Sequence, residues 1–249
     1  IESNHPKHQL QAEELLTRLL PFTGKAIRVG ITGAPGVGKS TFIEALGLHL
    51  TSRGQRIAVL AVDPSSGISG GSILGDKTRM SRLSAEPNAY IRPSPSAGTL
   101  GGVASKTRES MLVCEAAGYD IVLVETVGVG QSETMVADMT DCFLALMLPG
   151  AGDDLQGIKR GLLELVDVIA VNKADEETLT AAELAARQYN MAIKSLMGTQ
   201  QYPPQVLTCS ALHNRRVDQV WEAIEERYEE LRATDKFSRS HRQQPVRWL

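Results

Sequence analysis

Residues 33–40, GAPGVGKS, combine three glycines with a lysine and a serine. The glycines can adopt backbone conformations that other residues avoid, so peptide N–H groups can approach an anion closely. A strand-like run, IRVGIT (27–32), precedes the segment, and a helical pattern (38–52) follows it. The order G-x-x-x-x-G-K-S between a strand and a helix predicts a loop that surrounds phosphate oxygens at a helix N-terminus.

The two residues that close this motif have separate uses on a bound nucleotide. Lys39 can reach the β- and γ-phosphates, and the Ser40 hydroxyl is a hard oxygen ligand suited to Mg²⁺. The nucleotide-binding residues expected in this loop are Gly33, Ala34, Pro35, Gly36, Val37, Gly38, Lys39, Ser40 and Thr41. The alternative is an ordinary glycine-rich turn, which does not require all of the motif's positions.

The segment VNKAD (171–175) ends another strand-like run and carries the pattern N-K-x-D. The Asp175 carboxylate can accept two hydrogen bonds from guanine, whereas adenine would leave this charge unpaired. The aliphatic stem of Lys173 can lie against the base, and we expect Asn172 to tie this loop to the phosphate-binding loop. The pattern therefore predicts a guanine nucleotide rather than ATP.

A shorter pattern, CSAL (209–212), follows the strand-like QVLT. The backbone of Ser210 and Ala211 is placed to contact guanine O6, and Leu212 completes the predicted base-binding segment. The Ser-Ala pair is a weak pattern alone and gains weight from its place downstream of N-K-x-D.

The segment ETVGVGQSE (125–133) also follows a strand-like run. Glu125 is placed near a metal ion, and the N–H of Gly128 near the γ-phosphate; a solvent-facing strand end is the alternative for Glu125. A glutamine directly after such a glycine often positions the attacking water. Here Val129 stands in that place and Gln131 comes later, which predicts slow intrinsic hydrolysis or a catalytic group from a partner.

The stretch AVDPSSGISGGSILGDKTRM (61–80) has the glycines and acids of a switch loop. Asp63 and Asp76 can serve a hard cation, and such loops order around the γ-phosphate and Mg²⁺. A turn before Pro64 is the alternative for Asp63, and a solvated carboxylate is the alternative for Asp76. The expected catalytic residues are Lys39, Asp63, Asp76, Glu125 and Gly128, and the expected metal ligands are Ser40, Asp63, Asp76 and Glu125.

A second candidate switch is PGAGDDLQGIKRG (149–161), which holds two acids and two bases. Its acids, Asp153 and Asp154, can instead complement the dipole at the start of a helix. The segment follows a strand-like run, as the other motifs do, so it is expected at the same edge of the sheet.

These motifs require a framework that brings several strand ends together. Short β-branched runs alternate with helical patterns, which predicts a parallel sheet covered on both faces. The expected strands are 27–32, 57–63, 89–93, 120–125, 142–148, 166–172 and 205–209, and the expected helices are 38–52, 102–117, 155–164, 178–198 and 216–233. The predicted fold class is α/β, a P-loop NTPase with a mostly parallel sheet, helices on both faces and flanking helices at the termini.

Composition sets wider limits. The chain has 249 residues, 42% of them apolar, and a net charge of -3, which gives no reason to expect nucleic acid or an anionic membrane as a partner. No apolar run reaches about 18 residues, so no membrane span is expected. Three scattered cysteines indicate buried free thiols in a reducing, cytoplasmic compartment. The chain starts at Ile1 and stops at Leu249, and we expect residues to be missing at both ends.

The chain resembles the MeaB/ArgK family of G-proteins from about residue 5 to about residue 230. Five motifs carry this resemblance: the phosphate loop, the two switch segments, ETVGVGQSE and VNKAD. The resemblance implies GTP/GDP binding with Mg²⁺, GTP hydrolysis and a homodimer. It also implies chaperone work on adenosylcobalamin-dependent methylmalonyl-CoA mutase, gating cofactor loading and protecting the mutase. The phosphate, metal and guanine residues named above match the family's positions, and Gln156 and Lys159 match an additional switch.

The resemblance also implies a division of the chain. Residues 1–24 form an N-terminal helical extension, 25–234 the GTPase domain, and 235–249 the start of a C-terminal dimerisation extension. Two other functions remain open: a metallochaperone GTPase and a transport-system kinase. Metal delivery typically needs clustered cysteine and histidine, which the five histidines and three cysteines do not form, and N-K-x-D argues against an ATP kinase.

Overall fold

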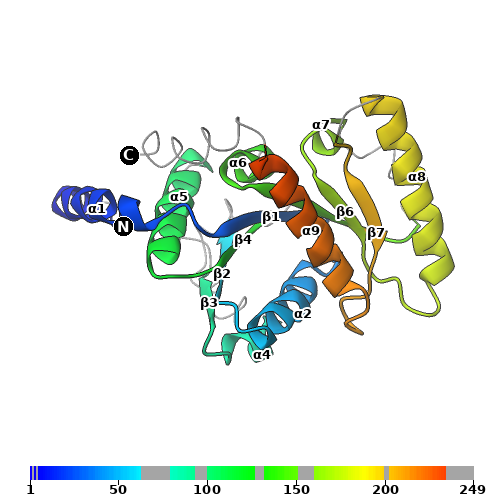
Figure 1. Ribbon diagram of the computed structural model, residues 1–249, viewed down its shortest axis with the longest axis horizontal. Coiled ribbons are helices and arrows are strands. Elements are labelled where there is room, and N and C mark those ends of the chain that lie inside the picture. The colour runs from blue at the N-terminus through cyan, green and yellow to red at the C-terminus, as the bar shows by residue number, and fades with distance from the viewer. Residues whose placement is uncertain are drawn as a thin grey trace.

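A seven-stranded parallel sheet forms the centre of the molecule, in the order β3-β2-β4-β1-β5-β6-β7 (Figure 1). The computed structural model describes residues 1, 3, 5–62, 79–92, 100–126, 132–150, 160–198 and 202–233. The strands are β1 (Ile27–Gly33), β2 (Ile57–Val62), β3 (Ala89–Arg92), β4 (Ile121–Thr126), β5 (Cys142–Met147), β6 (Val168–Val171) and β7 (Gln205–Thr208). The predicted α/β class is confirmed.

Two layers of helices cover the two faces of the sheet. The helices are α1 (Pro6–Leu19), α2 (Lys39–Ser52), α4 (Ser81–Ser84), α5 (Leu100–Ala116), α6 (Ser132–Met139), α7 (Arg160–Leu163), α8 (Leu179–Met197) and α9 (Val217–Arg232), with a 3-10 turn at Leu20–Phe22. One apolar core joins α2, α4 and α9 to the sheet and contains Phe42, Leu83 and Trp221. The other joins α5, α6, α7 and α8 to the opposite face and contains Met111 and Tyr189. The central strands are therefore buried on both sides, as their continuous apolar runs predict.

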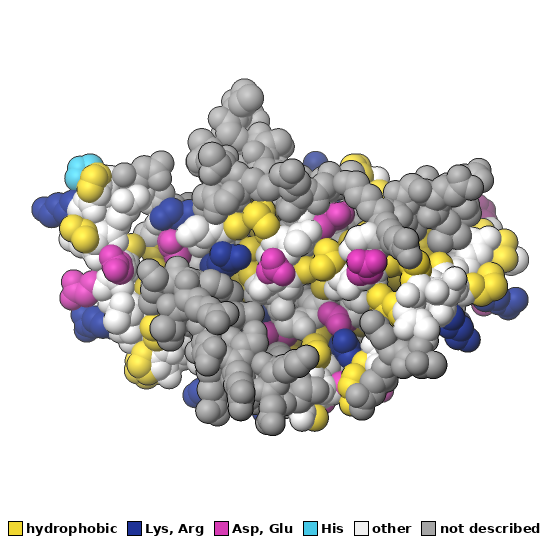
Figure 2. All heavy atoms as spheres, turned by 90° about the horizontal axis from the view of Figure 1, so that it is seen from above, with side chains coloured by type: hydrophobic (Ala, Val, Ile, Leu, Met, Phe, Trp, Pro, Cys, Tyr) yellow, Lys and Arg dark blue, Asp and Glu magenta, His cyan; other side chains and the backbone are white. Residues whose placement is uncertain are grey.

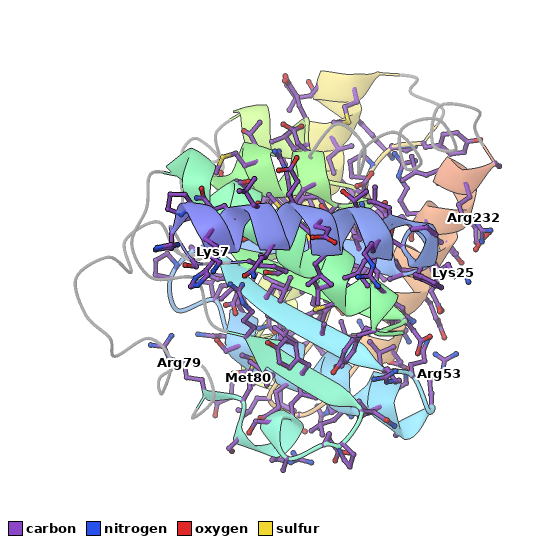
Figure 3. All side chains as sticks on the ribbon, turned by 90° about the vertical axis from the view of Figure 1, so that its left-hand side faces the viewer. Lys7, Lys25, Arg53, Arg79, Met80 and Arg232 are labelled. Carbon is purple, nitrogen blue, oxygen red and sulfur yellow. The ribbon has the colours of Figure 1, made fainter. Side chains whose placement is uncertain are left out.

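The N-terminal helix α1 lies at one end of the molecule and packs on α5 (Figures 1 and 3). Ala12 and Leu16 are its buried residues, whereas Leu10 is 69% exposed and Leu15 is 46% exposed. A helix is therefore present within the predicted N-terminal extension, and part of its leucine-rich surface is exposed.

The helix α6 was not predicted from the sequence. Its eight residues are too few to display a clear period, and it follows a glycine-rich segment. Within the described residues, the predicted helix 155–164 appears as the single turn α7, and residues 151–159 lie outside the description. The expected C-terminal extension, 235–249, lies outside it as well.

Three aspartates at the amino ends of strands complete the backbone hydrogen bonding of their neighbours. The donors are the N–H groups of Arg56 to Asp120 (2.7 Å), of Arg28 to Asp141 (2.8 Å) and of Phe143 to Asp167 (2.9 Å). Each aspartate directly precedes a strand, namely β4, β5 or β6, so aspartate has the same structural role at three places along this edge. The carboxylates at this end of the sheet are accordingly structural.

The three cysteines are free and buried, as the sequence predicts. Burial raises the pKa of Cys114 to about 11 and that of Cys209 to about 12, and it also raises the pKa of Cys142. These thiols are therefore protonated at neutral pH and behave as small apolar side chains.

A buried ion pair joins the sheet to α5. Arg28 Nε lies 2.5 Å from Glu115 Oε1, and the side chains are 0% and 1% exposed. The second oxygen of Glu115 accepts a hydrogen bond from the N–H of Gly24, in the segment that leads from α1 into β1. One carboxylate thus fixes a strand, a helix and the connection to the N-terminal helix.

Replacing Glu115 with alanine is expected to lower the free energy of unfolding by about 3–5 kcal/mol, because a buried guanidinium loses this carboxylate partner. Urea denaturation at neutral pH measures the change. The control is Glu222→Ala on the exposed side of α9, for which we expect a change within about 0.5 kcal/mol. A loss below about 1 kcal/mol for Glu115→Ala would contradict the role given to this pair.

Candidate nucleotide-binding site

The loop between β1 and α2 has the backbone geometry of an anion cradle. Gly36 and Gly38 have φ values of 78° and 94°, in the left-handed region that favours glycine. Gly38 is the N-cap of α2, and a Cβ placed on it would lie 2.8 Å from Asn172 Nδ2. Only glycine fits here, since both the backbone conformation and the contact with the neighbouring loop exclude a side chain. Peptide N–H groups at such a helix start can bind phosphate oxygens.

Lys39 begins α2 and folds back over this loop. Its Nζ donates hydrogen bonds to the carbonyl oxygens of Gly33 (2.7 Å) and Ala34 (3.3 Å). Burial lowers the pKa of Lys39, and the nearby carboxylates of Glu125 and Glu133 act in the opposite direction. The loop therefore offers one cation, held between backbone carbonyls and two acids, at the place where the motif predicts phosphate.

Glu125 lies at the carboxyl end of β4, beside both neighbouring strands. It is in register with Ile31 of β1 and Ala61 of β2, and it is 6% exposed. The alternative in which Glu125 faces solvent is therefore wrong. Burying a carboxylate among apolar residues alone is unfavourable, so we expect Glu125 to interact with polar groups or a cation.

The described part of the predicted metal site consists of Ser40 and Glu125. A hydroxyl at the start of α2 and a buried carboxylate are hard oxygen donors, so they fit Mg²⁺ and do not fit a soft-ligand metal. Elsewhere in the described chain no three His, Cys, Asp or Glu side chains gather in a way that could hold a metal ion. The other two predicted metal ligands, Asp63 and Asp76, lie outside the described residues, as do the switch-segment residues Gly128, Val129, Gln131, Asp153, Asp154, Gln156 and Lys159.

The side chain of Asn172 joins three loops. Its Nδ2 donates to the carbonyl oxygen of Val37 (2.8 Å) in the β1–α2 loop, and its Oδ1 accepts from the N–H of Ala211 (3.0 Å). Asn172 is 2% exposed, so water does not compete for these bonds. The predicted tie between the N-K-x-D loop and the glycine-rich loop is confirmed, and the same amide also holds the segment after β7.

The Asp175 carboxylate is oriented by a side chain that the sequence did not single out for this purpose. Ser210 Oγ donates to Asp175 Oδ1 at 2.5 Å and accepts from the N–H of His213 at 3.2 Å. His213 Nε2 lies 3.9 Å from the same carboxylate oxygen. Asp175 is only partly buried, so it remains accessible to a ligand while one of its oxygens is fixed.

Thr178 forms hydrogen bonds with the backbone of the N-K-x-D loop. Its hydroxyl donates to the carbonyl oxygen of Lys173 and accepts from the N–H of Asp175 (3.1 Å). Lys173 has a φ of 58° and an exposed side chain, a conformation that this hydroxyl helps to maintain. The only signal for Thr178 was its position three residues after the aspartate, where a hydroxyl often caps a turn.

The two amides expected to contact guanine O6 are used within the protein in this structure. The N–H of Ser210 donates to the carbonyl oxygen of Arg215 (3.0 Å), and that of Ala211 donates to Asn172. Leu212 follows them and is 72% exposed, which places an apolar side chain at the outer side of the loop. The backbone of Ser210 and Ala211 thus shapes the predicted base-binding segment, and the Ser210 hydroxyl links this segment to Asp175.

The described surface shows no segregation of charge on the face seen in Figure 2, where basic and acidic side chains are interspersed. None of the helices in the described ranges combines the length and the apolar character that crossing a bilayer requires. This distribution agrees with the small net charge of the chain.

Several sequence relatives of the chain are named as GTPases. The family model described as "Methylmalonyl Co-A mutase-associated GTPase MeaB" matches residues 1–249. The chain is 56% identical over its whole length to "Probable GTPase Rv1496" of Mycobacterium tuberculosis and covers 74% of that protein. It is 51% identical to "GTPase ArgK" of Escherichia coli (76% of that protein), and 45% identical to the mouse "Methylmalonic aciduria type A homolog, mitochondrial" (63% of that protein), with the whole chain aligned in both.

The solved structures agree with these relatives. A crystal structure titled "LAO/AO transport system kinase" superposes with a TM-score of 0.82 and 43% identity over 99% of this chain and 74% of that one. HypB from Helicobacter pylori, solved with nickel, superposes with a TM-score of 0.58 over 90% of this chain and 96% of that one, but at 14% identity it supports the fold alone. The chain is a GTP hydrolase that belongs to the family of methylmalonyl-CoA mutase-associated GTPases called MeaB.

Proposed function

We propose that the chain hydrolyses GTP to GDP and phosphate at the site built by the β1–α2 loop, Glu125 and the Asn172–Asp175 loop. The single observation that carries this proposal is the set of hydrogen bonds made by the Asn172 side chain. They join the Asn172–Asp175 loop to the β1–α2 loop and to the segment after β7. A nucleotide can occupy both loops at once only if the distance between the loops matches its length and stays fixed. The buried amide supplies that fixed separation.

In this proposal Lys39 and the loop amides hold the β- and γ-phosphates. Ser40 and Glu125, with Asp63 and Asp76, would hold Mg²⁺, which neutralises charge on the phosphates during hydrolysis. The chemistry expected of the site is positioning and electrostatic stabilisation, since phosphoryl transfer needs little covalent participation from the protein. Val129 stands where a water-positioning glutamine is often found, so we expect slow intrinsic turnover or a group supplied by a partner.

Base selection is assigned to Asp175. Ser210 fixes Oδ1 and Thr178 fixes the backbone, so the carboxylate can accept hydrogen bonds without first losing conformational freedom. Guanine presents two donors to such a carboxylate, N1–H and the C2 amino group, whereas adenine has an acceptor at N1 and no donor at C2. This difference favours a GTPase over an ATP-dependent kinase.

The proposed partner is methylmalonyl-CoA mutase, for which this GTPase would act as a G-protein chaperone that gates cofactor loading and protects the mutase. Two findings support an association: the name of the matching family, and the name of the mouse relative, which refers to methylmalonic aciduria. A homodimer and a cytoplasmic location are part of the same proposal.

Changing Asp175 to asparagine is expected to weaken GTP binding by roughly 10²-fold, because guanine loses a charged acceptor for two hydrogen bonds. Binding should shift toward XTP, whose C2 oxygen can accept a hydrogen bond from the new amide. Competition binding with GTP, XTP and ATP measures the shift. The matched control is Glu176→Gln, next to it but exposed and paired with Arg215; unchanged GTP affinity in Asp175→Asn would remove Asp175 from the base site.

Association with the mutase is expected to depend on the nucleotide. The full-length GTPase is mixed with methylmalonyl-CoA mutase in the presence of GDP, a non-hydrolysable GTP analogue or no nucleotide. Pulldown and GTP turnover are both measured, and we expect binding and rate to differ between the nucleotide conditions. Identical behaviour in all conditions would refute the chaperone role and leave the GTPase intact.

A further inference from the structure

The turn that joins β7 to α9 carries the predicted base-binding segment and lies at the lower edge of Figure 1. Two sets of hydrogen bonds close this turn. Ser210 and Arg215 form an antiparallel bridge, in which the N–H of each residue donates to the carbonyl oxygen of the other (3.0 and 2.9 Å). Next to this bridge, Arg216 Nη1 donates to Thr208 Oγ1 at 2.8 Å. The bond between Arg216 and Thr208 has no role in the assignments above.

This bond joins the two ends of the turn. Thr208 is the last residue of β7 and is 7% exposed, and Arg216 is the N-cap of α9. Each end is anchored in the fold, because Thr208 is in register with Val171 of β6, and Val217, which follows Arg216, is completely buried in the core. The Arg216 side chain therefore links a fixed strand to a fixed helix across the mouth of the turn.

The backbone of Arg216 is in an unusual conformation. Its φ of 58° and ψ of 17° lie in the left-handed region, and Asn214 in the same turn has a φ of 50°. Residues with a side chain adopt this region seldom, and they keep it where the surrounding contacts impose it. The shape of the turn thus depends on its hydrogen bonds more than on local backbone preference.

The shape of the turn in turn sets the orientation of Asp175. Ser210 lies two residues after Thr208, and its hydroxyl donates to Asp175 Oδ1 at 2.5 Å. The backbone of Ser210 is held by Arg215, the residue directly before Arg216. A bond that keeps the ends of the turn together therefore also keeps the Ser210 hydroxyl against the carboxylate. A carboxylate held in advance can bind a ligand with a smaller loss of conformational freedom.

We propose that Arg216 is a positioning residue for guanine recognition, which acts through Thr208 and Ser210 on the Asp175 carboxylate. The inference rests on the proposed function in one respect, namely that Asp175 accepts hydrogen bonds from guanine N1–H and from the C2 amino group. When the turn is not held closed, the carboxylate is free to rotate. The C2 amino group then contributes less to binding.

Inosine diphosphate separates this role from a purely structural one. Its base keeps N1–H and lacks the C2 amino group, so the ratio of its dissociation constant to that of GDP measures how well the protein recognises the amino group. A role in stability alone would lower the midpoint of thermal unfolding and leave this ratio unchanged in the folded protein. A positioning role lowers the ratio toward one.

The test measures GDP and inosine diphosphate binding by the wild type, Arg216→Asn, Thr208→Val and the double variant. Asparagine tolerates the left-handed backbone and is too short to replace the guanidinium, and valine keeps the β-branched shape of threonine without its hydroxyl. We expect each single variant to raise the dissociation constant of GDP by about threefold to tenfold and to lower the ratio. The double variant should bind GDP no more weakly than the weaker single variant, because both substitutions remove the same bond.

Two control variants separate this bond from other changes near the turn. Arg187 of α8 lines the same groove beside β7 as Thr208 and Arg216, so Arg187→Gln is a matched loss of an arginine and should leave both dissociation constants unchanged. Thr208→Ser keeps the hydroxyl that accepts from Arg216. We expect it to retain the ratio of the wild type.

Wild-type GDP binding by folded Arg216→Asn and Thr208→Val overturns the inference, as does an equal loss of affinity for the two nucleotides or an additive double variant. Should Arg216→Asn not fold, the comparison of Thr208→Val with Thr208→Ser carries the test. A lower ratio for the valine variant then supports the inference, and equal ratios overturn it. A wild type that binds inosine diphosphate as tightly as GDP would instead overturn base selection by Asp175, together with this inference.

Discussion

The site depends on the amide of one asparagine. Asn172 leaves the end of β6 and bonds a carbonyl of the β1–α2 loop on one side and a peptide N–H of the segment after β7 on the other. Gly38 permits this approach, since a Cβ there would collide with the amide. Because the asparagine is buried, each of its bonds must be made internally, and the three loops can adopt only the arrangement that satisfies them.

The two ends of the parallel sheet divide structural and chemical work. At the amino ends, the carboxylates of Asp120, Asp141 and Asp167 accept hydrogen bonds from backbone N–H groups of neighbouring strands, and the Arg28–Glu115 pair anchors α5. At the carboxyl ends, carboxylates and hydroxyls converge around the glycine-rich loop. Parallel pairing makes this division possible, because it brings every strand end of one kind to the same edge.

Much of this arrangement was predictable because it follows from patterns that extend along the chain. Short runs rich in apolar and β-branched residues identify the strands, and the glycines of GAPGVGKS identify the cradle. The role of Asn172 was also predictable, since N-K-x-D implies a tie to the phosphate loop. Such inferences succeed where a local pattern and the fold require the same residue.

Contacts between residues distant in sequence were not predictable in the same way. The Thr32–Glu133 and Ser210–Asp175 bonds join residues 101 and 35 positions apart, and no spacing rule connects them. Glu133 was visible at the end of ETVGVGQSE, but its burial depends on α6, a helix too short to show a period. The internal use of the Ser210 and Ala211 amides likewise depends on the turn at Arg215, which the sequence does not specify.

The central claim is that one guanine nucleotide spans the two loops that Asn172 holds together. A crystal structure of the protein with GDP and Mg²⁺ tests it most directly. The account predicts the diphosphate against the amides of residues 34–40 and the guanine N1 and N2 groups against the Asp175 carboxylate. A diphosphate bound anywhere else, or a base that does not contact Asp175, would contradict it.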